Sequence, residues 1–324
     1  MDSQSWLALT GGLGLFLFGL ATMRDGLEKV AAERLKPVIQ VLAGTLTRGV
    51  AAGTVVTALV QSSTAVTVMV VGLVDAGAMT LEQAVGVIMG ANLGTTITAQ
   101  LIAFRVGGFS YLAILVGALI RLFGRSESQK RLGEAVAGAG LIFAGLTAVS
   151  AALIPLHQHP GFGRFLTAYG TVPVVAFFFG ALLTALVQSS AVVVGLCEVL
   201  AAQGFIDIFV AFPAVLGSNV GTCVTALLSS LGTSLTARRA AVSHLLLNVL
   251  GAVGFLVISR WIAPLSTLGA IEPARQVANA HTFFNFVSGV ILLPFAPQIV
   301  ALAKRVVPAN GVGRGRRPRG PRSR

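Results

Sequence analysis

Apolar stretches separated by short polar segments run along almost the whole chain. A helix needs about 20 mainly apolar residues to cross a bilayer. Stretches that could cross or enter a membrane lie at residues 6–23, 50–75, 81–104, 109–123, 132–154, 172–202, 208–231, 240–259 and 277–303. The pattern therefore predicts an all-α polytopic membrane protein.

Two of these stretches carry a polar triplet at their centre. We call Gln61–Ser63, within 50–75, the first tip, and Gln188–Ser190, within 172–202, the second tip. A helix from Val50 to Val60 is about 16 Å long at about 1.5 Å per residue, so it reaches only about the middle of a core roughly 30 Å thick. We expect each stretch to be a re-entrant helical hairpin with its triplet at the turn.

The chain repeats itself at an offset of 127 residues. Residues 53–101 and 180–228 share 19 of 49 positions, including both triplets and a second signature, GANLGTTITA at 90–99 against GSNVGTCVTA at 217–226. A weaker match joins 14–20 to 140–146. The repetition predicts two related units, 6–123 and 132–259, followed by an additional transmembrane helix at 277–303.

Composition and charge add an orientation. The chain is 55% hydrophobic and 10% charged, with mean hydropathy +0.87 and net charge +12. If both tip segments are hairpins, 19 of the 23 Lys and Arg fall on one side, in loops 24–49, 121–131 and 232–239 and in a tail, 304–324, that we expect to be disordered. The positive-inside rule makes that side cytoplasmic.

This scheme gives each unit three full crossings, so the second unit is inverted relative to the first. Inverted repeats with interrupted helices are typical of secondary transporters. We expect a multi-pass protein of the plasma (inner) membrane, with its N-terminus outside, its C-terminus in the cytoplasm and anionic lipid at the basic loops. The basic tail is better explained by orientation than by nucleic-acid binding.

The tips have the chemistry of an oxyanion site. A helix that restarts after a tip presents free N–H groups and the positive end of its dipole, with hydroxyl groups as further donors. The candidate substrate-binding residues are Gln61, Ser62, Ser63, Thr64, Gln188, Ser189 and Ser190. None of them is basic, so the charge of a bound anion would be met by co-bound cations and helix ends.

The second signature predicts a sodium site. Glycines flank Asn92 and Asn219, a pattern that suits a helix break whose carbonyls join side-chain oxygens around a cation. The candidate sodium ligands are Asn92, Thr95, Thr96, Asn219, Thr222, Ser62 and Ser189, and Glu198 is a candidate for coupling. Small residues also serve helix packing, but packing does not need Gln and Asn at membrane depth.

These motifs resemble those of the type II sodium/phosphate cotransporter family. The resemblance rests on the two QSS triplets, GANLGTT (90–96), GSNVGTC (217–223), GLGLFLFGL (12–20), SHLLLNVLG (243–251) and AHTFFNFVSG (280–289). It implies that inorganic phosphate moves with sodium by alternating access at a site between the tips, with no cofactor. Thr64, Ala191 and Cys223 depart from the family pattern, which puts one ligand of the second unit in doubt.

Other interpretations stay open at this point. Hydroxyl groups and helix ends would also suit another oxyanion, and paired hairpins also build ion channels. An enzyme is disfavoured, because two equivalent Ser-Ser tips make poor sense for one nucleophile. For His244 with Asn248, and for His281 with Asn285, we favour hydrogen bonding between helices over ligation.

Overall fold

All regular elements in the part of the chain that the structure describes are helical. The structure is a computed structural model and describes residues 3–42, 44–104, 108–155 and 172–309. Within these described ranges, six helical stretches are long and apolar enough to cross a membrane, which agrees with the predicted all-α membrane protein. The elements are α1 (Ser3–Leu42), α2 (Leu46–Val60), α3 (Ser63–Asp75), α4 (Leu81–Ala103), α5 (Phe109–Phe123), α6 (Glu127–Leu153), α8 (Pro173–Val187), α9 (Ser190–Ala202), α10 (Ile208–Gly221), α11 (Cys223–Ser229), α12 (Leu235–Val257), α13 (Ser259–Ile262), η3 (Ala263–Thr267), α14 (Pro273–Leu292), η4 (Leu293–Phe295) and α15 (Ala296–Val306).

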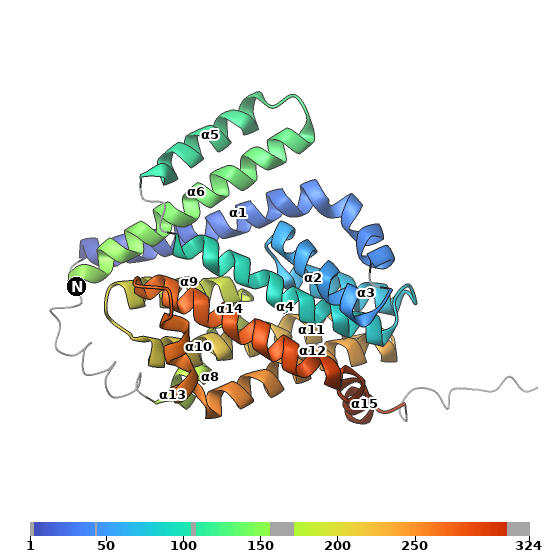
Figure 1. Ribbon diagram of the computed structural model, residues 1–324. Coiled ribbons are helices and arrows are strands. Elements are labelled where there is room, and N and C mark those ends of the chain that lie inside the picture. The colour runs from blue at the N-terminus through green and yellow to red at the C-terminus, as the bar shows by residue number, and fades with distance from the viewer. Residues whose placement is uncertain (1–2, 43, 105–107, 156–171, 310–324) are drawn as a thin grey trace, which may run out of the picture.

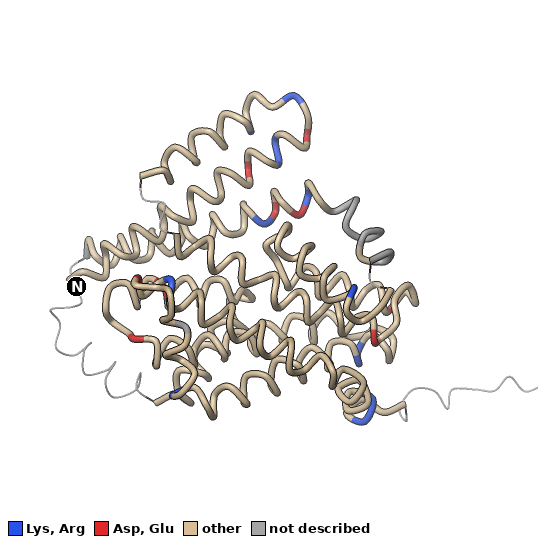
Figure 2. The backbone as a smooth tube through the Cα atoms, viewed as in Figure 1, with Lys and Arg blue, Asp and Glu red and all other residues tan. Residues whose placement is uncertain are grey.

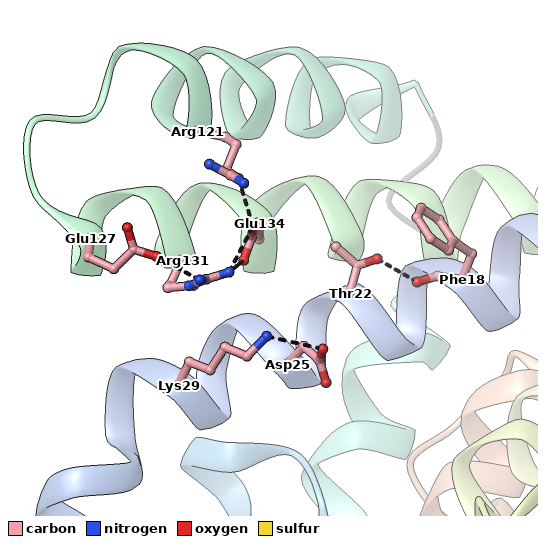
Figure 3. Close-up of polar contacts among 8 residues, drawn as sticks. All are labelled: Phe18, Thr22, Asp25, Lys29, Arg121, Glu127, Arg131 and Glu134. Carbon is pink, nitrogen blue, oxygen red and sulfur yellow. Dashed lines mark hydrogen bonds and ion pairs between the residues drawn. The ribbon is translucent and has the colours of Figure 1, made fainter.

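The helices form a body with a pair of helices at one edge. Helices α5 and α6 are antiparallel at that edge, α1 lies beside α6, and the other helices make up the body (Figure 1). Charged residues are sparse in the body and cluster at the α5–α6 turn, in α1 and near α15 (Figure 2). At the α5–α6 turn, Arg121 and Arg131 pair with Glu134 at 2.6 and 3.0 Å (Figure 3).

The 127-residue repeat appears in the helix boundaries. The bounds of α2 and α3 return, shifted by 127 residues, as those of α8 and α9, and α4 corresponds to α10 with α11. Helix α2 packs on α4 and α8 packs on α10 through equivalent glycines, because a Cβ at Gly90 would overlap the carbonyl oxygen of Val50, and one at Gly217 that of Phe177. The same local packing is therefore built twice.

The weaker match also has a structural counterpart. Helices α1 and α6 run antiparallel in contact, with Gly12 against Gly145 and Gly19 against Gly138. At an offset of 126, Gly12 corresponds to Gly138 and Gly19 to Gly145. The Gly12–Gly145 contact therefore corresponds to the Gly138–Gly19 contact, as expected for a local two-fold axis. Because neither glycine of a pair has a Cβ, the two backbones approach closely, as small residues allow in membrane helices.

The signature glycines serve packing rather than a break in the first unit. We expected interruptions at Asn92 and Asn219, but α4 runs without interruption through both flanking glycines. A Cβ at Gly86, Gly90 or Gly94 would collide with the backbone of α2, so the absence of side chains there permits contact between the helices. In the second unit, a one-residue interruption occurs at Thr222, between α10 and α11.

Two other boundaries differ from expectation. The expected loop 24–49 is helical as far as Leu42, because its residues include good helix formers and an Asp25–Lys29 pair at helical spacing. The expected single helix 277–303 is interrupted by a 3-10 turn at Leu293–Phe295, where Pro294 removes a backbone donor. Helix α15 then includes Lys304 and Arg305, and residues 310–324 of the predicted tail lie outside the described residues.

Substituting Gly90 tests the packing of α2 on α4. Gly90→Ala should lower the free energy of unfolding by about 1–3 kcal/mol, because the new methyl group overlaps the backbone of α2. Thermal unfolding of the purified protein measures this. The matched control is Gly72→Ala in α3, where a Cβ has no neighbour within 4 Å. Equal stability of the two variants would contradict this packing.

Accessibility labelling tests the predicted hairpins. Single cysteines at Arg48 and Asp75, the two ends of the first hairpin, should react with a membrane-impermeant thiol reagent from the same side. The two native cysteines, Cys197 and Cys223, are buried and provide the background signal. Labelling from opposite sides would mean that the segment crosses fully, and the inverted topology would then fail.

Candidate functional site

Each tip is a left-handed turn made by a glutamine. Gln61 has φ 58° and ψ 27°, and Gln188 has φ 58° and ψ 30°. They are the only non-glycine residues with positive φ in the described part of the chain. This conformation costs a residue with a Cβ roughly 1–2 kcal/mol. Glycine would avoid that cost, so the glutamine side chain is the feature to explain.

The first tip is held by side chains from two other helices. Thr98, in α4, donates its hydroxyl hydrogen to Gln61 Oε1 at 2.7 Å, and Gln61 Nε2 donates to the carbonyl of Ala58. Arg24, in α1, donates from Nε to the main-chain carbonyl of Gln61 at 3.0 Å. The side chain of Gln61 is buried. This tip is therefore tied to both α1 and α4.

The restart after the first tip follows the expected cap geometry. Ser62 is the N-cap of α3 and accepts a hydrogen bond from the amide of Ala65 at 3.2 Å. Ser63 and Thr64 lie in the first turn of α3, and all three residues are half-buried. Free amides at this helix end would favour an anion.

The second tip has the same backbone but different side-chain contacts. Gln188 is exposed, and its side chain makes no hydrogen bond to any described residue. Ser189 and Ser190 are buried, and Ser189 Oγ has no partner among the described residues. The counterpart of Thr98 is Thr225, whose buried hydroxyl also lacks a described partner. The hydrogen bond between Thr98 and Gln61 at the first tip therefore has no counterpart among the described residues of the second tip.

The two tips lie against neighbouring turns of α1. Ala191 and Val192, just after the second tip, belong to one buried cluster with Phe16, Leu20 and Met23 of α1. The next residue, Arg24, contacts the first tip. A hydroxyl at position 191 would face this apolar cluster, which accounts for Ala191 where the first unit has Thr64.

The candidate sodium ligands form contacts between helices rather than with the tips. Asn92 Nδ2 donates to Asn248 Oδ1 of α12 at 3.2 Å, and Asn219 Oδ1 lies 3.4 Å from His281 Nε2 of α14. Each signature Asn therefore contacts one of the two His-x-x-x-Asn motifs, through Asn248 in one and His281 in the other, which confirms hydrogen bonding between helices for these two residues. Among the described residues, no hydrogen bond joins Asn92 or Asn219 to a tip serine. The hydroxyls of Thr95, Thr96 and Thr222 are buried and donate to carbonyls of their own helices.

A family model matches most of the chain. The model of the Na+/Pi-cotransporter family covers residues 15–151 and 155–272, which include both tips and both signatures. The chain belongs to the Na+/Pi-cotransporter family. The Na+/Pi-cotransporter homologues are transporters and not enzymes, and the family uses no cofactor.

Similar proteins include bacterial and mammalian members. A Bacillus subtilis protein named "Uncharacterized protein YqeW" is 28% identical over 94% of this chain and 99% of its own length. The Salmonella typhimurium "Putative inorganic phosphate export protein YjbB" is 30% identical over 93% of this chain, which spans only 55% of that protein. The mouse "Sodium-dependent phosphate transport protein 2C" is 33% identical over 37% of this chain and 20% of its own length. No solved structure matches.

Arg24 contacts the first tip but is not among the candidate residues identified from the sequence. It is half-buried within the first candidate span, and no carboxylate of the described residues lies within ion-pair distance of it. Its neighbour Asp25 instead pairs with Lys29 at 3.4 Å (Figure 3). The charge pattern predicts a loop at Arg24, because Arg24 is the first charge after an apolar stretch. Helix-forming residues after it were the signal that α1 continues.

The other missed residues were visible as motif positions. Thr98 and Thr225 are the last hydroxyl residues of the two repeated signatures.

Glu198, the candidate coupling residue, lies in α9 and is 2% exposed; its role stays a prediction. Cys223 is buried, with Sγ 3.7 Å from the carbonyl oxygens of Asn219 and His244.

A cavity of about 490 Å³ lies beside the first tip. Gln61 and Thr98 provide its polar lining, and the remaining lining residues are apolar. Such a lining suits hydrocarbon better than an anion. An oxyanion would therefore be better matched by the helix ends and Arg24 than by this cavity. The apolar lining residues are Met23, Leu101, Ile102, Phe104, Ala139, Ile142 and Phe143.

Thr98 and Thr225 form a matched pair for mutation. Thr98→Val leaves Gln61 Oε1 without its donor and should destabilise the protein by about 1–3 kcal/mol. Thr225→Val replaces a hydroxyl that has no described partner and should be neutral or slightly stabilising. Unfolding measurements on both variants test the difference between the tips, and equal losses would show that the two tips are fastened alike.

Proposed function

We propose that the chain couples sodium ions to the movement of inorganic phosphate by alternating access, with phosphate held between the two tips. The observation that carries this proposal is the inequality of the tips. The Gln61 side chain is fastened to Thr98, whereas Gln188 and Thr225, the equivalent pair, are apart. Alternating access between repeats requires two equivalent gates, one closed and one open. We propose that each tip is one of these gates.

The local two-fold relation supports the inverted orientation of the halves. Helices α1 and α6 contain the matched stretches 14–20 and 140–146 and run antiparallel. If both cross the membrane, the axis relating them lies in the membrane plane. That symmetry belongs to inverted-repeat carriers. With it we propose an N-terminus outside, a C-terminus in the cytoplasm and a plasma-membrane location.

Arg24 supplies the positive charge that the tips themselves lack. A guanidinium is planar and can donate to two oxygens of a phosphate at once. Arg24 uses Nε for the carbonyl of Gln61. Its terminal nitrogens form no ion pair with any described carboxylate. We propose that they face the anion, next to the N-terminal ends of α3 and α9.

Family membership favours phosphate as the anion and sodium as the coupled ion. Two of the relatives named above are called "Sodium-dependent phosphate transport protein 2C" and "Putative inorganic phosphate export protein YjbB". The ion gradients would determine the direction of net transport. Another oxyanion and an uncoupled channel are the alternatives, and flux measurements separate them.

Phosphate flux into liposomes tests the proposal. Uptake should saturate with phosphate and collapse when the sodium gradient is removed or sodium is replaced by choline. Uptake that is indifferent to sodium would contradict the symport. Non-saturating conductance would indicate a channel, and preference for sulfate over phosphate would change the cargo.

Substitutions in α1 test the role of Arg24. Arg24→Gln should raise the KM for phosphate roughly 10- to 100-fold, the loss expected for a hydrogen bond to a charged group. Arg24→Lys keeps the charge but not the planar fork, so its KM should be intermediate. The control is Lys29→Gln on the exposed face of the same helix, which should transport normally. A KM for Arg24→Gln equal to that of the unmodified protein would remove Arg24 from the anion site.

A further inference from the structure

The apolar cavity beside the first tip has no role in the proposed transport cycle. Its volume is about 490 Å³, whereas one water molecule takes up roughly 30 Å³ of liquid. Protein interiors contain few voids larger than a water molecule, and a cavity lined by hydrocarbon stays dry and takes up apolar molecules. Its size is that of a small-molecule site, about 300–1,000 Å³. The cavity therefore calls for an apolar occupant.

The cavity lies between the C-terminal end of α4 and the pair of helices α1 and α6 (Figure 1). At this end of α4, the lining residues Leu101 and Phe104 are 48% and 59% exposed, so the cavity reaches the surface of the protein. All three helices contain candidate membrane spans. Exposed apolar side chains on such helices face hydrocarbon. A lipid of the bilayer can therefore enter the cavity from the side.

A cation lies at this opening. Arg275, in the first turn of α14, has its Cζ atom 4.1 Å from the centre of the Phe104 ring. Cation–π attraction holds a guanidinium in such a position. In the described part of the chain, no carboxylate forms an ion pair with Arg275. A guanidinium can donate to two oxygens of a phosphate group at once. The opening thus combines an apolar ring with a cation that suits a phosphate.

We propose that one acyl chain of a bilayer glycerophospholipid occupies this cavity, while the phosphate group of the same lipid binds Arg275. The stretch of α4 from Thr98 to Phe104 is about 9 Å long at about 1.5 Å per residue. An acyl chain crosses half of a core roughly 30 Å thick, so it is long enough to reach the closed end. The positive charge favours a lipid with an anionic headgroup. A free phosphate ion would match Arg275 but would leave the cavity empty.

The closed end of the cavity is the hydrogen bond that fastens the first tip. Thr98 and Gln61 are its polar lining residues, and their side chains are joined at 2.7 Å. A chain in the cavity would cover this bond with hydrocarbon and exclude the water that competes with it, and a hydrogen bond is stronger in such surroundings. The bound lipid would therefore stabilise the fastened state of the first tip.

The lipid site does not depend on phosphate transport, because lipid binding can be measured without flux. Only the leaflet depends on the proposed orientation, which places Arg275 outside and therefore assigns the site to the outer leaflet.

Native mass spectrometry of the purified full chain, with phosphatidylglycerol added to the detergent, tests the site. One lipid should bind more tightly than all later ones. Ala139→Leu places a larger side chain on the cavity wall and should weaken the binding of this first lipid at least tenfold. Arg275→Gln removes the hydrogen bonds from a charged group and should weaken it about 10- to 100-fold.

Two control variants make the same changes elsewhere. Ala151→Leu enlarges an exposed residue of α6 that does not line the cavity, and Arg260→Gln removes an exposed arginine of α13. Both should bind the first lipid as the unmodified protein does. A phosphatidylglycerol with a photoreactive acyl chain should label the cavity residues Leu101 and Ile142 in the unmodified protein. This labelling decides the matter if Ala139→Leu fails to fold.

The outcomes separate this inference from the proposed function. The absence of a tightly bound lipid, equal affinities of Ala139→Leu and Ala151→Leu, or photolabelling confined to the exposed face of α5 would overturn the site. Displacement of the lipid by inorganic phosphate, with unchanged affinity in Ala139→Leu, would assign Arg275 to a free anion and would also overturn it. Tight binding that Ala139→Leu and Arg275→Gln both weaken would support the site even if liposomes show no phosphate flux. Sodium-driven flux without a tightly bound lipid would leave the symport standing without this site.

Discussion

A helix end inside a membrane protein leaves main-chain groups that hydrocarbon cannot satisfy, and the fold is arranged around two such ends. Each is made by a glutamine in a left-handed conformation, followed by a serine in extended conformation. A backbone that glycine would adopt more easily is retained with a long polar side chain. The surrounding helices have to bury these turns, and α1 and α4 do so for the first, with Arg24 bound to its carbonyl.

Different residues of the same helix provide close packing and polar contacts. On one face of α4, Gly86, Gly90 and Gly94 let α2 approach, and on the same helix Asn92 and Thr98 reach α12 and the first tip. This explains why glycines and amides alternate in the signature. The repeat reproduces two of these packing glycines, as Gly217 and Gly221, with Pro213 in place of the third, whereas the polar contacts differ between the halves. The proposed alternating access rests on that difference.

The sequence allowed the helical class, the repeat and the two tips to be predicted, because hydropathy and an ungapped internal match report these features directly. It did not reveal that α4 is continuous, since glycines beside Asn92 suit both a break and a close contact. Arg24 was missed because charge patterning assigns a lone arginine after an apolar stretch to a loop. The asymmetry between Gln61 and Gln188 could not be predicted, since both lie in the same sequence, ALVQSS, and share a backbone conformation, and they differ in the contacts that other helices make with them.

The most direct test of alternating tips is the sidedness of their accessibility. Single cysteines at Gln61 and Gln188 would be treated with a membrane-impermeant thiol reagent from either side, under opposite sodium gradients. The account predicts that Gln188→Cys reacts when Gln61→Cys is protected, from one side only, and that reversing the gradient exchanges the two patterns. Reaction of both positions from the same side under every condition would contradict it.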